Sequence, residues 1–249
     1  MYLKGKVALV TGSALGFGAG IAQAMGRAGA KVCATDVDDE NLDRCAASMK
    51  SDGCDVMALH LDAADPAAFR DTVDKMVSRW NRVDILVHTG VIMPLLHFEE
   101  TSEDLGWREL KISLGGLVNG TRAVWEVMKA RGGGHIISIA SGSSFRGYTR
   151  EVMYCTGKHA AEGFVKALAL EAAPYNISLN TVGPGKTIKP TGLTGAQLEK
   201  TPEAIRARWT DPAELGNGLV WLASQPAGRF SGLRFDAGPI VDTIYSEGW

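Results

Sequence analysis

The sequence predicts a single doubly wound α/β domain, in which helices cover both faces of a seven-stranded parallel sheet. Short β-branched runs alternate with longer amphipathic stretches along all 249 residues, the pattern of successive strand–helix–strand units. The strand-like runs at 7–10 and 136–139 are mainly apolar on both faces, as expected where helices bury both sides of a sheet. The chain has no repeat and no low-complexity linker, so we place residues 1–249 in one domain.

The elements expected from this pattern alternate from one end of the chain to the other. We expect strands at Val7–Val10, Lys31–Asp36, Asp55–Leu61, Asp84–His88, His135–Ala140, Ser178–Val182 and Leu233–Asp236. We expect helices at Gly18–Ala28, Glu40–Lys50, Pro66–Trp80, Ser102–Ala130, Met153–Ala173 and Pro212–Ala223. The segment at about 185–210 is rich in proline and glycine and is predicted to be a substrate lid, with a short helix over Gly195–Arg208.

The composition suits a globular chain with a sizeable core and argues against several classes of partner. Hydrophobic residues make up 45% of the chain and charged residues 22%. The net charge of −2 gives no electrostatic reason to expect nucleic acid or an anionic membrane. The four cysteines lack the spacing of a metal site or a disulfide framework, so we expect no metal. With no leader-like N-terminus and no apolar run near the ~20 residues of a membrane span, we expect a cytoplasmic protein that acts on a small molecule.

A glycine-rich turn, Thr11-Gly12-Ser13-Ala14-Leu15-Gly16-Phe17-Gly18, joins the first expected strand to the first expected helix. Glycines there let the backbone turn tightly and approach a pyrophosphate, whose charge then lies at a helix N-terminus. Tight strand–helix turns also use glycine for steric reasons alone. The position in the first strand–helix unit favours the dinucleotide-binding interpretation.

Asp36 ends the second expected strand, about twenty residues after the glycine turn. A carboxylate there accepts hydrogen bonds from a ribose diol and repels a 2′-phosphate, so we expect NAD rather than NADP. The acids that follow, Asp38, Asp39 and Glu40, are also explained by the start of the next helix, where negative charge is stabilised.

Tyr154 and Lys158 lie four residues apart and therefore on one face of a predicted helix. A neighbouring ammonium stabilises phenolate, so Lys158 is expected to lower the pKa of Tyr154 toward a range useful for proton transfer. Ser141 ends a predicted strand and can hydrogen-bond the same substrate oxygen. Taken alone, a tyrosine and a lysine at this spacing are common on exposed helix faces.

Together, these motifs resemble the short-chain dehydrogenase/reductase family, and the match runs nearly end to end. The TGxxxGxG motif spans 11–18, Ser141 precedes Tyr154 by thirteen residues, Asp62 stands where the family has an adenine-contacting aspartate, and Pro184-Gly185 matches the motif that flanks the nicotinamide. The resemblance implies a Rossmann domain, with Tyr154 as general acid/base, Lys158 holding the nicotinamide ribose and Ser141 orienting the substrate oxygen.

The resemblance also supplies the expected binding residues. Those expected to bind cofactor are Gly12, Ser13, Leu15, Gly16, Phe17, Gly18, Asp36, Val37, Asp62, Ala63, Gly90, Tyr154, Lys158, Pro184, Gly185 and Thr187. Those expected to bind substrate are Ser141, Ser143, Arg146 and Tyr154; for Ser143 a capping role, and for Arg146 a solvated surface position, are the alternatives. If Arg146 and Lys186 both face the substrate, an anionic substrate is favoured.

The sequence departs from the family pattern in two places. The residues after the fourth strand read His88-Thr89-Gly90-Val91 instead of NNAG, which gives His88 a supporting hydrogen-bonding role. Ser113 stands where the family has an asparagine that supports a relay water; a serine can hold a water with shorter reach, so Ser113 joins the expected catalytic residues.

We therefore expect an NAD-dependent enzyme that transfers hydride reversibly between NAD(H) and a secondary alcohol, polyol or hydroxy acid, and that assembles as a homo-oligomer, a dimer or a tetramer. A 3-oxoacyl-type carbonyl reductase is the nearest alternative and is disfavoured by Asp36. A non-catalytic dinucleotide sensor or scaffold is the alternative from another class, motivated by His88 and Ser113.

Overall fold

A computed structural model describes residues 1–189 and 199–247. The seven strands are β1 Val7–Thr11, β2 Lys31–Asp36, β3 Val56–His60, β4 Ile85–His88, β5 Gly134–Ile139, β6 Ile177–Gly183 and β7 Arg234–Asp236. They form one parallel sheet in the order β3-β2-β1-β4-β5-β6-β7, so the predicted fold class and all seven predicted strands are confirmed.

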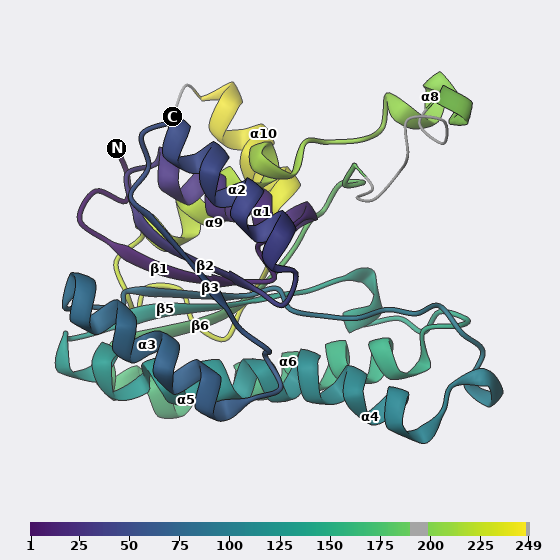
Figure 1. The fold of residues 1–249 in the computed structure, drawn as a ribbon, viewed down its shortest axis with the longest axis horizontal. Helices are drawn as coiled ribbons and strands as arrows, with labels where there is room; N and C mark the ends of the chain where they lie inside the picture. The colour runs from purple at the N-terminus through teal and green to yellow at the C-terminus, as the bar shows by residue number, and fades with distance from the viewer. Residues whose placement is uncertain (190–198, 248–249) are drawn as a thin grey trace.

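Helices cover both faces of the sheet (Figure 1). The described α-helices are α1 Gly16–Arg27, α2 Asp39–Ser51, α3 Pro66–Trp80, α4 Glu103–Leu110, α5 Gly116–Ala130, α6 Val152–Ala172, α8 Glu203–Arg206, α9 Pro212–Ser224 and α10 Ala237–Ser246. Short 3-10 turns are η1 Phe98–Glu100, η3 Gly142–Ser144 and η4 Ala173–Tyr175, and η2 Lys111–Gly115 is a π-helical turn. None of the described helices combines the length and the apolar composition that a membrane span needs.

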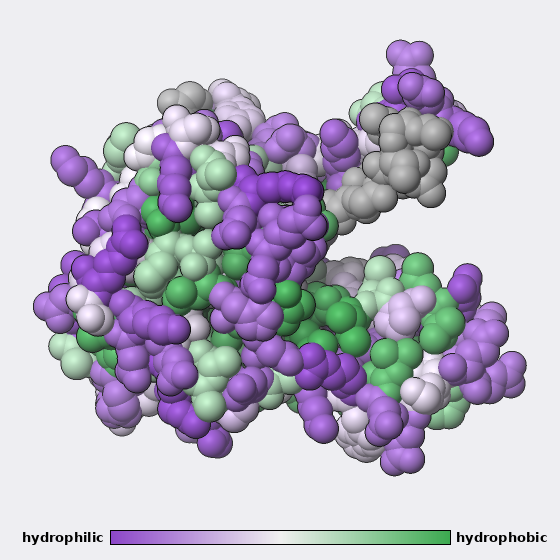
Figure 2. All heavy atoms as spheres, in the orientation of Figure 1, coloured by the Kyte–Doolittle hydropathy of each residue, from purple (hydrophilic) through white to green (hydrophobic). Residues whose placement is uncertain are grey.

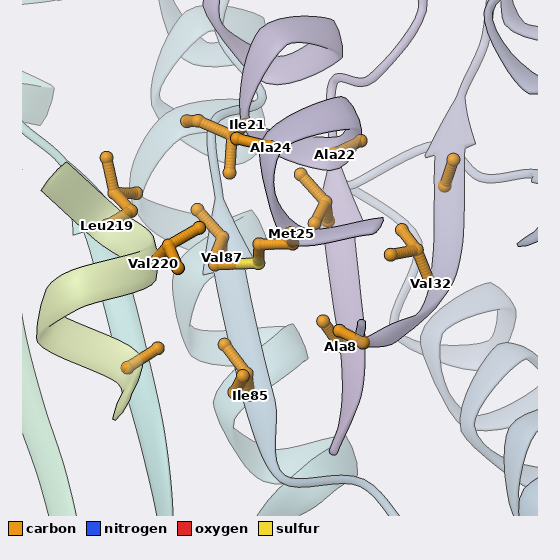
Figure 3. Close-up of a cluster of buried hydrophobic side chains, with 14 of the residues drawn as sticks. Ala8, Ile21, Ala22, Ala24, Met25, Val32, Ile85, Val87, Leu219 and Val220 are labelled. Atoms are coloured by element: carbon orange, nitrogen blue, oxygen red, sulfur yellow. The ribbon is translucent and has the colours of Figure 1, made fainter. Parts of the chain in front are cut away.

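Two hydrophobic clusters, one on each face of the sheet, hold the layers together. Along β1, Ala8 and Val10 belong to the cluster beneath α1 and α9, whereas Val7 and Leu9 belong to the cluster that includes α3, α5 and α6. This alternation follows the period of two in a strand. Figure 3 shows the first cluster, where Met25 and other side chains of α1 meet those of α9 and of the central strands.

Side chains cap several helices where the sequence placed their starts. Asp38 accepts a hydrogen bond from the Asn41 amide and caps α2, as its acidic context indicated. Asp65, Ser102 and Asp211 cap α3, α4 and α9 in the same way. Each cap fixes the residue at which a helix begins. The loops that lead into these helices surround the carboxyl ends of the strands, so their lengths are fixed as well.

The structure corrects the sequence interpretation in two places. The predicted helix Ser102–Ala130 is three elements, α4, the π turn η2 and α5, because one turn accommodates an extra residue. The chain after β7 forms α10, which the sequence interpretation had left as a tail. Part of the predicted lid, 190–198, lies outside the described residues, and with it the start of the predicted helix Gly195–Arg208. In the described part, Ile188 pairs with Thr210, and α8 lies within the predicted helix.

Candidate active site

A cavity of about 560 Å³ lies at the carboxyl ends of the strands. Its lining includes the end of β1 and the residues just after β4, two strands that are adjacent in the sheet at the point where the strand order reverses. Open α/β sheets bind their ligands at such a reversal. The molecule is visibly hollowed on the side where α4 and the α8 segment project (Figure 2).

Most of the predicted site residues line this cavity. They are Gly12, Leu15, Gly16, Phe17, Gly18, Asp36, Val37, Asp62, Ala63, Gly90, Ser141, Tyr154, Lys158 and Pro184. Six others do not line it: Ser13, Ser113, Ser143, Arg146, Gly185 and Thr187. The sequence motifs therefore converge on one place, from both halves of the chain.

The glycine turn is shaped by backbone geometry that excludes side chains. Gly12 and Gly16 have φ values of 65° and 59°, which favour glycine. A Cβ on Gly12 would lie 2.4 Å from the Thr89 hydroxyl oxygen, and a Cβ on Gly18 only 1.9 Å from the Gly12 carbonyl oxygen. Ser13 is fully buried within this turn, and its hydroxyl donates to the Val10 carbonyl at 2.6 Å. Ser13 therefore shapes the turn instead of facing the cavity.

Asp36 connects the end of β2 to the glycine turn. Its Oδ2 accepts a hydrogen bond from the Ala14 amide at 2.9 Å, and its Oδ1 accepts from the amides of Val37 and Asp38 at 2.8 and 3.1 Å. The carboxylate is thus held in one orientation by backbone donors while it lines the cavity.

Asp62, the predicted adenine-contacting residue, is engaged by an arginine that the sequence interpretation missed. Arg108 of α4 donates to Asp62 Oδ2 at 2.6 Å, and the Ala64 amide donates to Oδ1 at 2.9 Å. Arg108 itself lines the cavity. The two residues are 46 positions apart, so no local pattern in the sequence could have paired them.

Ser141, Tyr154 and Lys158 meet at the other end of the cavity. Ser141 follows β5, and the other two lie on successive turns of α6. Lys158 Nζ donates to the Ile139 carbonyl at 2.6 Å and lies 5.5 Å from the centroid of the Tyr154 ring. Three of the four predicted catalytic groups are therefore brought together by the end of one strand and one helix.

The electrostatics of this end differ from the sequence expectation. Burial raises the pKa of Tyr154, and the hydrogen bond with Ser141 opposes that rise without reversing it. Burial lowers the pKa of Lys158 to about 8, while the carboxylate of Glu162 acts to raise it. The pKa of Tyr154 is therefore raised and not lowered as the sequence predicted, because burial destabilises the charged forms of both Tyr154 and Lys158.

His88 links β1 to the π turn in the interior. Its Nε2 lies 3.0 Å from the Ser113 carbonyl oxygen, which can only accept, so Nε2 carries the proton and Nδ1 accepts from the Thr11 hydroxyl at 3.0 Å. Burial, and next the charge of Lys158, lower the pKa of His88 to about 4. A Cβ on Gly116 would lie 2.6 Å from the imidazole ring, so the ring fits only beside a glycine. The structure thus gives His88 the supporting role that its position suggested.

Ser113 makes contacts unlike those expected of a relay residue. Its hydroxyl donates to the Glu109 carbonyl one turn earlier, at 2.8 Å, and its own carbonyl accepts from His88. Gly157, beside Lys158, is the small residue that leaves room for this hydroxyl, since a Cβ there would lie 2.4 Å from Ser113 Oγ.

The predicted substrate residues outside the cavity have other partners. Ser143 is buried and donates to the Glu151 carboxylate at 2.7 Å. The guanidinium of Arg146 is exposed and lies 5.3 Å from the Phe145 ring. Lys186 pairs with Asp242 at 2.5 Å, which compensates its charge.

Thr187 and Gly185 hold the chain segment at the edge of the cavity through their backbone. The Thr187 carbonyl accepts from the Thr210 amide at 2.9 Å, and Gly185 has a φ of 68° and packs closely against β7 and α10. Both therefore hold the segment whose neighbours Pro184 and Ile188 line the cavity.

Comparison with known proteins agrees with this geometry. A family model described as "short chain dehydrogenase" matches residues 6–201. The 3-alpha-(or 20-beta)-hydroxysteroid dehydrogenase of Mycobacterium bovis is 33% identical over 98% of this chain and 93% of its own length. The D-threitol dehydrogenase of Mycolicibacterium smegmatis is 32% identical over 92% and 90%.

Solved structures share the fold. The carveol dehydrogenase of Mycobacterium avium, determined in complex with NAD, superposes with a TM-score of 0.84 over 94% of this chain and 96% of its own, at 22% identity. The family match and the full-length relatives go further than the fold. The chain belongs to the short-chain dehydrogenase family.

Proposed function

We propose that the protein is an NAD-dependent oxidoreductase that transfers hydride reversibly between NAD(H) and a secondary alcohol, polyol or hydroxy acid, with Tyr154 as general acid/base. The observation that carries this proposal is the composition of one cavity. Ser141, Tyr154 and Lys158 line one end, and the glycine turn and Asp36 line the other.

The residues of the turn fit a dinucleotide. Gly12 and Gly18 leave no room for a Cβ, so the backbone is exposed to the cavity at the N-terminus of α1, where a pyrophosphate is stabilised. The carboxylates of Asp36 and Asp38 line the cavity at the end where a ribose would lie, and they disfavour the 2′-phosphate of NADP. NAD, when bound, supplies the hydride acceptor.

The side chains at the reaction end supply proton transfer and orientation. In alcohol oxidation Tyr154 removes the hydroxyl proton while the substrate carbon loses hydride, and in the reverse direction Tyr154 returns the proton. Ser141 hydrogen-bonds the substrate oxygen. Lys158 lies 5.5 Å from the centroid of the Tyr154 ring, where its ammonium can bind the nicotinamide ribose, and burial lowers its own pKa to about 8.

Two relatives support a secondary alcohol as substrate, since their names specify a hydroxysteroid and threitol. Ser143 orients Glu151 beside Tyr154 and so contributes to the substrate side indirectly. The absence of Arg146 from the cavity lining weakens the case for an anionic substrate.

The test is NAD-linked and NADP-linked absorbance at 340 nm with a panel of secondary alcohols, polyols and hydroxy acids. Tyr154→Phe should lower kcat by about 10²–10⁴-fold with cofactor affinity retained. Tyr175→Phe, on the partly exposed ring that packs against Trp125, is the matched control and should leave kcat unchanged. Turnover that survives Tyr154→Phe would refute the proposed mechanism, and tight NAD binding without turnover on any substrate would favour the dinucleotide sensor.

A further inference from the structure

A third ionisable residue follows the catalytic pair on α6. Tyr154, Lys158 and Glu162 are spaced by four and therefore share one helix face. The Glu162 residue is only 8% exposed, and a buried carboxylate is costly unless it is paired. Its Oε2 accepts from the Thr181 hydroxyl of β6 at 3.1 Å, and its Oε1 accepts from Arg234 Nη1 of β7 at 3.1 Å.

Arg234, which binds Glu162, also contacts the backbone of the catalytic serine. Its Nη2 makes two long hydrogen bonds, to the Ser141 carbonyl at 3.4 Å and to Asp236 Oδ1 at 3.5 Å. Its guanidinium carbon lies 4.7 Å from the centroid of the Phe145 ring, just beyond Ser141. A Cβ on Gly183 would lie 3.0 Å from Nη2, so β6 leaves only enough room for the guanidinium. One side chain from the edge strand thus connects β7, α6 and the end of β5.

Among the described residues, few ionisable groups lie near Lys158. Its own helix contributes Tyr154 and Glu162, and β4 contributes His88, whose pKa of about 4 keeps it neutral near pH 7. The β5 strand contributes only the Ile139 carbonyl. Glu162 is therefore the negative charge that opposes the effect of burial on the pKa of Lys158.

We propose that Glu162 and Arg234 are positioning residues for the reaction: Glu162 keeps Lys158 in its charged form, and Arg234 holds both Glu162 and the strand end that carries Ser141. This inference rests on the proposed function, because it assigns a role toward the same catalytic groups.

Substitutions of the two residues should shift the alkaline limb of the pH profile of kcat, where Lys158 loses its proton, in opposite directions. Glu162→Gln keeps the shape but removes the negative charge, so the limb should move down by about one pH unit. Arg234→Gln leaves the charge of Glu162 uncompensated, so the limb should move up. General damage to the site would move both variants in the same direction, and that result would overturn the proposal.

Two further variants separate charge from geometry. Arg234→Lys keeps a positive charge but not the two-pronged contact, so it should keep the limb in place while kcat falls on the order of tenfold through Ser141. Glu171→Gln, an exposed glutamate on the same helix, is the matched control and should shift nothing. An Arg234→Lys enzyme with unchanged kcat would contradict the role of Arg234 toward Ser141.

A direct measurement of the Lys158 titration makes this test independent of turnover. NMR of protein labelled at lysine ¹³Cε, with Lys158→Ala for assignment, follows the Lys158 titration without substrate or cofactor. We expect the Lys158 midpoint to fall in Glu162→Gln and to rise in Arg234→Gln. Unchanged midpoints would overturn the inference even if the enzyme is active, whereas shifted midpoints in a protein without turnover would refute the proposed function alone.

Discussion

The two ends of the cavity are built by different means. At the dinucleotide end, the backbone makes the site: glycines with positive φ shape the turn, and backbone amides hold the Asp36 carboxylate. At the reaction end, buried side chains from distant elements hold one another, as Glu162 and Arg234 do across 72 residues. The first end should therefore be sensitive to added atoms, and the second to altered charge.

The largest effect is expected from an added methyl group at the dinucleotide end. Gly18→Ala places a Cβ 1.9 Å from the Gly12 carbonyl oxygen, which belongs to the backbone and cannot rotate away. We expect NAD affinity to fall by about 100-fold or more, and the free energy of unfolding to fall by about 3 kcal/mol. Fluorescence titration with NAD and urea unfolding measure the two effects.

Gly163→Ala is the control for this substitution. Gly163 lies on the exposed side of α6, and a Cβ there meets nothing within 4 Å. We expect unchanged NAD affinity and a gain in stability of up to about 1 kcal/mol. Equal effects of the two alanines would show that the glycine turn is not specially constrained.

The next effect tests the buried side chains through pH. The pKa of His88 falls from 6.5 to about 4 on folding, so the unfolded chain takes up a proton first as the pH falls. Stability is therefore complete above about pH 6.5 and is lost toward pH 4, by on the order of 3 kcal/mol for His88. Burial lowers the pKa of His135 to about 4 as well, and His135 should add a comparable loss.

His88→Asn should remove the His88 share of this loss and leave that of His135. Urea unfolding of wild type and variant between pH 4.5 and pH 7.5 gives the difference between their slopes. Parallel curves for the two proteins would mean that His88 is not neutral in the folded state.

A smaller effect is expected where a charge is removed from the backbone-built end. Asp36→Asn keeps one of the two acceptor oxygens that the backbone amides use, replaces the other with a donor, and loses the charge at the cavity. We expect kcat/KM with NAD to fall about tenfold, with a gain for NADP. A preference for NAD that persists in Asp36→Asn would show that another feature sets the cofactor choice.

The smallest effect is expected at Ser113. Its hydroxyl donates to the Glu109 carbonyl one turn earlier, an interaction that adds little to a helix. Ser113→Ala should change kcat by less than about twofold and the free energy of unfolding by about 0.5 kcal/mol. A tenfold fall in kcat would restore the relay role that the sequence suggested.

The fold was predictable because its signal is local and repeated. The strands alternate between two cores with a period of two, and acidic or hydroxyl residues mark several helix starts. The extra residue of the π turn leaves no comparable mark, since an apolar pattern looks much alike with or without it. The start of α10 contains Gly238 and Pro239, which resemble a turn in sequence.

The site divides in the same way. The glycine turn and the Tyr154–Lys158 spacing are each contained in a few consecutive residues, and the structure brings them into one cavity. The arginine on Asp62 and the arginine behind Ser141 come from segments far away in the chain, where no spacing rule applies. Glu162 could have been identified from the sequence, because its spacing from Lys158 repeats that of Lys158 from Tyr154.

The π turn at Lys111–Gly115 also determines which face α5 turns toward the sheet relative to α4. An α-helix advances about 100° per residue, so one extra residue rotates everything after it by that angle. With that rotation α4 contacts α6, whereas α5 contacts α3 and β4 and buries Leu117 and Val124. A deletion of one residue here would turn those side chains away from the sheet. In this segment the number of residues is therefore constrained more tightly than their identity.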